Sequence, residues 1–440
     1  MSVLLHGGTV LPLRDSPRPV TGDLLVSGTR IGGVGQVTSP PDTEVVDISG
    51  CVVMPGLVQT HVHLVQTLFR GLAEDMPLLG WLRTRVWPLE AAHNEASVRA
   101  SVRLGLLDLL TTGTTTILDM GTTHFGDIVA EELVRSGIRA RFGQAMMDTG
   151  EGVPANLVET TRGSLDAGGA LTKRWHKASS GRIGYVYMPR FALSCTRELL
   201  EAVTQLAKLS DLLVHTHSNE SVDERTAVTM ATGRTPVQYL LDTGIASERT
   251  IIAHGVHLDD SEIEILKTTK TSVAHCPSSN LKLGSGIAQV ARLRSARITV
   301  GLGADGAACN NRLDGFEEIR LATLLARVVS GMGTLSGYDA MGLATREGAK
   351  MLRIDAEVGT LEQGKRADLV VLDLEKLDGP GGDPVARILF GGGSRAVRHV
   401  LVDGEFLVRD GRPTKMDANE VRAKAAEQLG PLMKRAGLAG

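Results

Sequence analysis

Short aliphatic runs separated by turn residues occupy the first fifty positions of the chain and recur near its end. They predict β-strands at residues 2–5, 23–35, 44–48, 367–373 and 399–408. Between these two groups, aliphatic runs alternate with stretches of helical periodicity, such as residues 95–110 and 317–329. This alternation indicates a barrel of parallel strands with helices outside it. We therefore expect a small β domain that is assembled from both termini and interrupted by the barrel.

The length of the chain agrees with this organisation. A (β/α)8 barrel takes about 250 residues, so a chain of 440 residues leaves room for an accessory domain. We predict an α/β protein with a TIM-like (β/α)8 barrel over residues 56–355 and a composite β-sandwich domain over residues 1–55 and 356–440. The polar, alanine-rich residues 417–436 predict a surface helix near the end of the chain.

The composition is that of a globular protein with a large core, because 42% of the residues are hydrophobic and 22% are charged. The formal net charge of −3, with both signs mixed throughout, provides no basic face for nucleic acid. No apolar stretch is long enough to span a membrane, and residues 1–7 lack the pattern of a signal peptide. The four cysteines are widely spaced, so we expect reduced thiols and a cytoplasmic location. The expected partner is a small molecule.

His61 and His63 follow an aliphatic run and are the first candidates for chemistry. Side chains two apart on a strand point to the same face, so both imidazoles can reach one point in space. Such pairs also occur in strands that bind nothing. Three later aliphatic runs, at residues 214–220, 251–255 and 300–306, carry further histidine, glutamate or aspartate residues at or near their ends. Because active sites of parallel barrels form where the strands end, the four segments together predict a metal site.

Six motifs stand in order along the chain. They are residues 54–63, 215–220, 253–255, 274–286, 303–311 and 359–369. Together they resemble the amidohydrolase superfamily, and more narrowly its cytosine deaminase-like branch. That branch includes deaminases of guanine and of 5′-modified adenosines (methylthioadenosine, S-adenosylhomocysteine and 5′-deoxyadenosine), as well as triazine hydrolases. The combination of motifs is specific for the superfamily and much less specific for the substrate.

The resemblance implies that His61, His63, His217 and Asp305 bind one divalent metal ion, which is zinc or iron in this branch. Three neutral imidazoles and one carboxylate suit such a cation and leave a coordination position for water. Hydrolysis needs that position, because the metal activates the attacking water.

The resemblance also implies the catalytic groups. Glu220 would move a proton from the water to the ring nitrogen beside the attacked carbon. His254 would hydrogen-bond the developing oxygen, and Asp305 would also carry a proton to the departing amine. His215 lies two residues before the ligand His217 on the same expected strand, and we expect it to be a hydrogen-bonded core histidine.

Four residues are candidates for substrate binding, namely Gln66, Trp87, Glu90 and Arg190. By resemblance, Glu90 matches an acid that holds ribose hydroxyls in methylthioadenosine-type deaminases, whereas Arg190 matches an arginine that reaches the base in guanine deaminases. The alternative role for Arg190 is a structural ion pair. The alternative for Glu90 is a solvent-exposed position at the start of a helix. Gln66 suits a purine edge in either class. The role of His275 is open between a structural one and a substrate contact.

The residues and the resemblance together predict a hydrolase of non-peptide C–N bonds, a metal-dependent deaminase of an amino-substituted purine. A 5′-modified adenosine is the first expectation, since residues 280–287 and 305–313 resemble those deaminases. A guanine-type base deaminase and a triazine amino- or chlorohydrolase are alternatives. An amine needs a proton to leave and chloride does not, so Glu220 and Asp305 together favour deamination. A non-catalytic scaffold is disfavoured because all these groups are present. A homo-oligomer is a further expectation from the resemblance.

Overall fold

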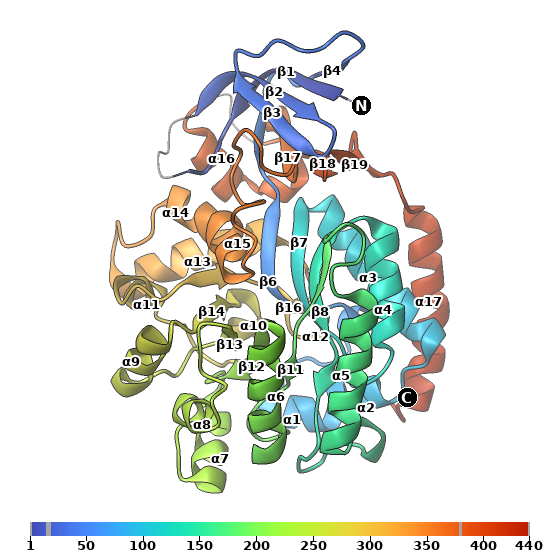
Figure 1. The fold of residues 1–440 in the computed structure, drawn as a ribbon, viewed down its shortest axis with the longest axis vertical. Coiled ribbons are helices and arrows are strands. Elements are labelled where there is room, and N and C mark those ends of the chain that lie inside the picture. The colour runs from blue at the N-terminus through green and yellow to red at the C-terminus, as the bar shows by residue number, and fades with distance from the viewer. Residues whose placement is uncertain (1, 15–18, 378–380, 439–440) are drawn as a thin grey trace.

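Two large β-sheets organise the described part of the chain (Figure 1). The computed structural model describes residues 2–14, 19–377 and 381–438. The first sheet is the barrel, in which neighbouring strands pair in parallel and β16 (Asp305–Gly306) lies beside β6. Its path runs through β10 (Ile183–Tyr185), β8 (Arg139–Gly143), β7 (Thr114–Met120), β6 (Leu57–His63), β15 (Val300–Leu302), β14 (Ser272–His275), β13 (Thr250–His254) and β12 (Val214–Ser218).

The two ends of this path meet across the segment that follows β10, which contains the short strand β11 (Met188–Pro189). Tyr187 forms a parallel bridge with Val214, and Phe191 forms one with His217. The main-chain N–H of His217 donates to the carbonyl oxygen of Arg190 at 2.9 Å. These contacts continue the parallel pairing from the last strand of the path to the first, as the prediction of a (β/α)8 barrel requires.

Helices connect the parallel strands and cover the outside of the barrel (Figure 1). They include α3 (Glu95–Thr111), α4 (Gly126–Ser136), α5 (Thr161–Trp175), α6 (Arg197–Ser210), α9 (Asp260–Thr269) and α13 (Gly315–Ser330). The helices expected at residues 95–110 and 317–329 are α3 and α13. The Asn94 side chain accepts from the Ser97 N–H and the Ser97 hydroxyl accepts from the Asn94 N–H, a reciprocal cap that fixes the start of α3. Strands β6 and β7 are buried along their whole length, as parallel strands covered on both faces should be.

The second sheet is built from both ends of the chain. It runs through β20 (Arg412–Pro413), β19 (Glu405–Arg409), β18 (Val397–Val402), β17 (Leu369–Asp373), β5 (Cys51–Pro55), β1 (Ser2–Val10), β2 (Val20–Ser27) and β3 (Arg30–Gly35), with β4 (Glu44–Asp47) beside β1. β5 and β17 pair antiparallel, with Val53 opposite Val371. These two valines pack with Leu5 and Leu24, whereas Met54 on the other face joins the barrel core. The prediction of a barrel with a β domain from both termini is confirmed.

Gly56 connects the two sheets, because it lies between β5 and β6. A Cβ atom at this position would lie 2.1 Å from Cγ2 of Thr115, so the chain can pass here only as glycine. Arg139 at the start of β8 adds an ionic clamp between the sheets. It donates from Nε to Asp368 Oδ2 at 2.7 Å and from Nη2 to Asp403 Oδ1 at 2.6 Å. The β domain is therefore fixed to the end of the barrel at which the strands begin.

The expected surface helix near the end of the chain is α17 (Ala418–Arg435). It runs beside α3 on the flank of the barrel (Figure 1), and Ala425 and Leu432 are buried in the apolar cluster that contains Leu68. The prediction assigns this helix to the β domain, because it lies within residues 356–440, but the helix packs on the barrel. The domain boundaries at residues 55 and 356 stay a prediction. Among the described residues, no helix has both the length and the apolar character needed to cross a lipid bilayer.

Candidate active site

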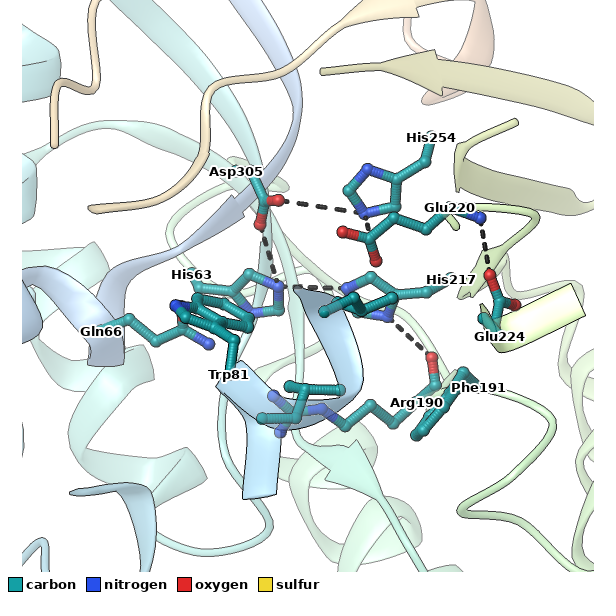
Figure 2. Close-up of a pocket in the computed structure, with 12 residues that line it drawn as sticks. His63, Gln66, Trp81, Arg190, Phe191, His217, Glu220, Glu224, His254 and Asp305 are labelled. Carbon is teal, nitrogen blue, oxygen red and sulfur yellow. Dashed lines mark hydrogen bonds and ion pairs between the residues drawn. The ribbon is translucent and has the colours of Figure 1, made fainter. Parts of the chain in front are cut away.

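Three histidines and an aspartate meet at the end of the barrel where the strands stop, and Figure 2 shows His63, His217 and Asp305 among them. His61 and His63 come from β6, His217 from β12 and Asp305 from β16. His63 Nε2 lies 3.2 Å from His217 Nε2. Asp305 Oδ1 lies 3.2 Å from His61 Nε2 and 3.4 Å from His63 Nε2. The fold thus brings together the four residues that the sequence predicts as metal ligands.

The second ring nitrogen of His63 and of His217 binds a main-chain carbonyl behind the site. His63 Nδ1 donates to the Met120 carbonyl oxygen at 2.8 Å, and His217 Nδ1 donates to that of Arg190 at 2.7 Å. A carbonyl oxygen can only accept, so each Nδ1 carries the proton and each Nε2 keeps a lone pair. In both rings, Nε2 is the atom that faces the point of convergence.

His61 has the same tautomer, with the proton on Nδ1, because of its hydrogen bond with His215. His215 Nδ1 donates to the Ile251 carbonyl oxygen at 2.9 Å, which leaves His215 Nε2 as an acceptor. His61 Nδ1 donates to this nitrogen at 2.7 Å, so the lone pair of His61 lies on Nε2. That buried Nε2 has no hydrogen-bond partner among the described residues. His215 is a hydrogen-bonded core histidine, as expected, and it orients a predicted ligand.

Burial keeps these imidazoles neutral. It lowers the pKa of His63 to about 3, and it lowers the pKa of His61 and, strongly, of His217. Burial alone would raise the pKa of Asp305, but His61 and His254 hold it well below its usual range. The site therefore offers three neutral nitrogen donors and one carboxylate. This donor set fits a borderline divalent cation.

Glu220 and His254 lie beside the four predicted ligands. His254 Nε2 is 3.4 Å from Glu220 Oε2 and 3.9 Å from Asp305 Oδ2. The main-chain N–H of Glu220 donates to Glu224 Oε2 at 2.6 Å. Burial, and after it the carboxylates of Asp305 and Glu224, raise the pKa of Glu220 well above its ordinary value. Of the two carboxyls, Glu220 therefore binds a proton more readily than Asp305 does.

Two neighbouring residues of α10 (Pro277–Lys282) hold Asp305 and His254. Ser279 Oγ donates to Asp305 Oδ2 at 2.7 Å, and His254 Nδ1 donates to Asn280 Oδ1 at 2.9 Å. Both α10 side chains are buried. The sequence assigns neither of them a role, although both lie in the motif at residues 274–286 and Asn280 also begins the segment at residues 280–287.

A cavity lies next to these groups (Figure 2). It is lined by His63, Gln66, Leu78, Trp81, Leu82, Arg190, Phe191, His217, Glu220, Glu224, His254 and Asp305. Of the four expected substrate contacts, Gln66 and Arg190 line the cavity, whereas Trp87 and Glu90 lie outside its lining. Trp81 lines it although sequence reasoning did not single it out. Trp81 and Trp87 both pack in one apolar cluster, and their spacing in the sequence does not tell which of them faces the cavity.

Glu90 lies against Arg190 and Gln66. Arg190 donates from Nη1 to Glu90 Oε2 at 2.7 Å and from Nη2 to Oε1 at 3.1 Å, and Gln66 Nε2 donates to Oε1 at 2.9 Å. Burial would raise the pKa of Glu90, but the charge of Arg190 lowers it. Both carboxylate oxygens thus have partners within the protein. The arrangement fixes the Gln66 amide and leaves its Oε1 without a hydrogen-bond partner among the described residues.

Comparison with known proteins agrees with this geometry. The profile of the amidohydrolase family matches residues 52–407. The chain belongs to the amidohydrolase family. The prediction of a hydrolase from this family is confirmed.

Three relatives of this amidohydrolase are informative. The 5-methylthioadenosine/S-adenosylhomocysteine deaminase of Halobacterium salinarum is 36% identical over 420 residues, which cover 94% of this chain and 95% of the relative. The 5′-deoxyadenosine deaminase of Methanothermobacter thermautotrophicus is 36% identical over 438 residues, covering 98% and 99%. The crystal structure of an adenosine deaminase from Xanthomonas campestris with bound zinc superposes with a TM-score of 0.91 at 28% identity, covering 99% and 98% of the two chains.

His275 of this amidohydrolase lies apart from the substrate cavity. It ends β14 and is buried, and burial lowers its pKa to about 3. Its side chain is not part of the cavity lining. Of the two roles left open for His275, this placement favours the structural one.

Proposed function

We propose that this amidohydrolase is a metal-dependent hydrolytic deaminase of an amino-substituted purine, with 5′-modified adenosines as its substrate class. The observation that carries the proposal is the convergence of three imidazole Nε2 atoms and one carboxylate beside a cavity that Glu220 and His254 also line. Relatives that are 36% identical over nearly the whole chain are named deaminases of methylthioadenosine, S-adenosylhomocysteine and 5′-deoxyadenosine.

His61, His63, His217 and Asp305 would hold the metal ion. We propose zinc, because the related adenosine deaminase structure contains zinc and the donor set suits it. When bound, the metal would lower the pKa of a water molecule and so supply a nucleophile at neutral pH. Iron is the alternative that metal analysis of the purified protein would detect.

Glu220 would handle the proton of the first step. Attack on the ring carbon that bears the amino group places electrons on the neighbouring ring nitrogen, which then needs a proton. Glu220 would take a proton from the attacking water and give one to that nitrogen. Its raised pKa favours this exchange, because such a carboxyl binds the proton taken from water more readily than an ordinary glutamate does.

His254 and Asp305 would act on the other side of the reacting carbon. The bond from His254 Nδ1 to Asn280 orients the ring so that Nε2 faces the cavity. From there Nε2 would form a hydrogen bond with the oxygen that develops on the ring carbon. Asp305 would carry the proton of the hydroxyl group added to the ring carbon to the departing amine, and the bond from Ser279 would hold its Oδ2 in place. Ammonia would leave once that proton has arrived.

Gln66 and Arg190 would contact the purine edge. Gln66 Oε1 is an acceptor without a partner among the described residues, and Arg190 supplies donors, so together they suit an edge that presents both a donor and an acceptor. Trp81 and Phe191 would contact the faces of the ring. Glu90 would reach ribose hydroxyls only after giving up part of its bonding to Arg190 and Gln66. This last observation favours a guanine-type base deaminase as the second candidate function.

Binding of any purine requires a larger cavity. The cavity measures about 30 Å³, which holds one or two water molecules, whereas ligand pockets commonly measure roughly 300–1,000 Å³. Leu78, Trp81 and Leu82 line it from α1 (Leu78–Trp81) and the first residue after that helix. We expect this segment to move when substrate binds.

Ammonia release from a substrate panel tests the proposal. The zinc-loaded protein would be incubated with 5′-deoxyadenosine, methylthioadenosine, S-adenosylhomocysteine, adenosine, guanine and melamine. Release from the adenosine group would support the proposed substrate class, and release from guanine alone would favour the second candidate. No release from any purine by metal-loaded protein would refute the purine assignment, and chlorinated triazines would be assayed next.

A further inference from the structure

Glu318 is a buried acid on α13 that lies outside the lining of the cavity. Its Oε1 accepts from Ser278 Oγ at 2.6 Å and from Asn310 Nδ2 at 2.9 Å, and its Oε2 accepts from the Ser278 main-chain N–H at 3.1 Å. These donors come from two different segments of the chain. One carboxyl therefore fixes the start of α10 and the end of α12 (Ala307–Asn310) relative to α13.

The hydrogen bonds between Glu318 and Ser278 affect both side chains that α10 holds, those of Asp305 and His254. Ser279, the next residue, donates to Asp305 Oδ2, and Asn280 accepts from His254 Nδ1. A short helix moves as a unit, so a shift of Ser278 would shift both contacts together. The side chains of Asp305 and His254 therefore depend on the position that Glu318 gives to α10.

The hydrogen bond between Glu318 and Asn310 affects the position of the main chain at Asp305. Asn310 Nδ2 also donates to the Ala304 carbonyl oxygen at 2.7 Å, and Ala304 directly precedes Asp305. The carboxylate of Asp305 is thus held by Ser279, and its backbone is held by Asn310. Glu318 supports both contacts, because it binds Asn310 directly and binds Ser278, the neighbour of Ser279.

The backbone at the two supported residues needs such support. Asp305 has a φ of 61° and His254 has a φ of 73°, which is the left-handed region that side chains other than glycine disfavour. A residue keeps such a conformation only when its surroundings hold it there. Without those contacts, both residues could relax and turn their side chains away from the cavity.

We propose that Glu318 is a positioning residue, which sets the geometry of the predicted ligand Asp305 and of His254 through Ser278 and Asn310. The inference rests on the proposed metal-dependent function, but its main test needs no substrate. Groups that hydrogen-bond directly to a metal ligand change metal affinity or activity by about 10–100-fold when they are removed, and Glu318 acts on Asp305 one contact further out.

Zinc affinity measured by competition with a chelator tests this role. The variant is Glu318→Gln, which keeps the shape of the side chain but has one acceptor oxygen instead of two. We expect its zinc dissociation constant to rise about 10-fold. The control is Glu317→Gln on the same helix, where the side chain is partly exposed and lies 3.7 Å from Arg320 at the surface. The control should stay within roughly 2-fold of the native protein.

A double variant shows whether Glu318 acts through α10. Ser279→Ala should weaken zinc binding by itself, and adding Glu318→Gln should weaken it by less than the product of the two single effects, because both changes release the same carboxylate. Ser278→Ala, which removes one hydroxyl donor, should shift the affinity in the same direction and serves if Glu318→Gln does not fold.

Unchanged zinc affinity in Glu318→Gln, or in Ser278→Ala if that variant is used, would overturn the proposal whatever the unfolding temperature and leave Glu318 as a packing residue. Independent, multiplicative losses in the double variant would also overturn it. If the substrate panel yields a substrate, the variant saturated with zinc should lose turnover with little change in KM. If the panel yields none, the zinc measurements still decide the role of Glu318, so the two proposals fail separately.

Discussion

Glu220→Gln is the sharpest test of the proposed chemistry, because it keeps the size of the side chain and removes its ability to exchange a proton. Glu220 is buried, lines the cavity and has its Oε2 3.4 Å from His254 Nε2. A glutamine amide can occupy the same space and can still bond to a neighbour. The ring nitrogen would then have to be protonated without a positioned acid.

The expected loss follows from this geometry. A positioned acid or base contributes about 10²–10⁴-fold to a rate, or about 3–5 kcal/mol of the barrier. Glu220 would serve two transfers in one turnover, so we expect kcat to fall about 10³-fold or more. KM should change by less than about 3-fold, because the loss concerns the transition state. Steady-state measurement of ammonia release and metal analysis of the same preparation would check both expectations.

Glu224→Gln is the matched control. Glu224 lines the same cavity, and its carboxylate accepts from the main-chain N–H groups of Glu220 at 2.6 Å and of Asn219 at 3.2 Å. Glutamine keeps one acceptor oxygen, so we expect a loss of no more than about 10-fold. A Glu220→Gln enzyme with full zinc and a near-native kcat would refute the proton relay. Equal losses in both variants would show that the loss comes from a disturbed loop.

Three further outcomes are expected. Asp305→Ala should weaken zinc binding by more than about 100-fold in chelator competition, since even indirect contacts are worth 10–100-fold. Arg139→Met should lower the free energy of unfolding by about 3–5 kcal/mol in a urea titration, because it leaves the Asp368 side chain, 1% exposed, without its cation. Its control is Arg174→Met, which breaks an exposed ion pair and should lower the free energy of unfolding by less than about 1 kcal/mol. Burial raises the pKa of Glu318 from 4.5 to about 7. The folded state therefore favours the protonated carboxyl, and this contribution to stability is fully present below pH 4.5. It is lost as the pH rises through 7. Between about pH 5.5 and pH 8, Glu318→Gln should therefore gain about 2 kcal/mol relative to the native protein in urea titrations, and a constant difference would contradict the raised pKa.

The barrel and the β domain could be predicted because their signals are periodic. Strand and helix periods alternate along the middle of the chain, and both ends carry strand patterns that need partners. His61 and His63 could be placed on one face because the period of a strand is two. His217 and Asp305 follow from strand ends and from the family motifs. Each of these inferences uses only local order in the sequence.

The contacts around the site could not be predicted because they join distant residues. Glu90 sits 100 positions from Arg190, and nothing near either residue indicates that the two form a buried pair. Glu318 reads as an ordinary charged residue of an amphipathic helix. Its role depends on Ser278 and Asn310 reaching the same carboxyl, which only the three-dimensional packing determines. Trp81, likewise, faces the cavity because of how α1 is oriented, and not because of a pattern in the sequence.

Strain in the backbone shows why these distant contacts matter. Asn219, His254 and Asp305 all have φ between 58° and 73°, and each such residue costs about 1–2 kcal/mol. Their sum of about 3–6 kcal/mol is a large part of the roughly 5–15 kcal/mol that stabilises a folded protein. Each strained residue also has a buried hydrogen bond to its side chain: Glu262 accepts from Asn219, Asn280 from His254, and Ser279 donates to Asp305. The left-handed turns direct these side chains at the strand ends, and the hydrogen bonds offset the strain, so the geometry of the site depends on Glu262, Ser279 and Asn280, which lie outside the lining of the cavity.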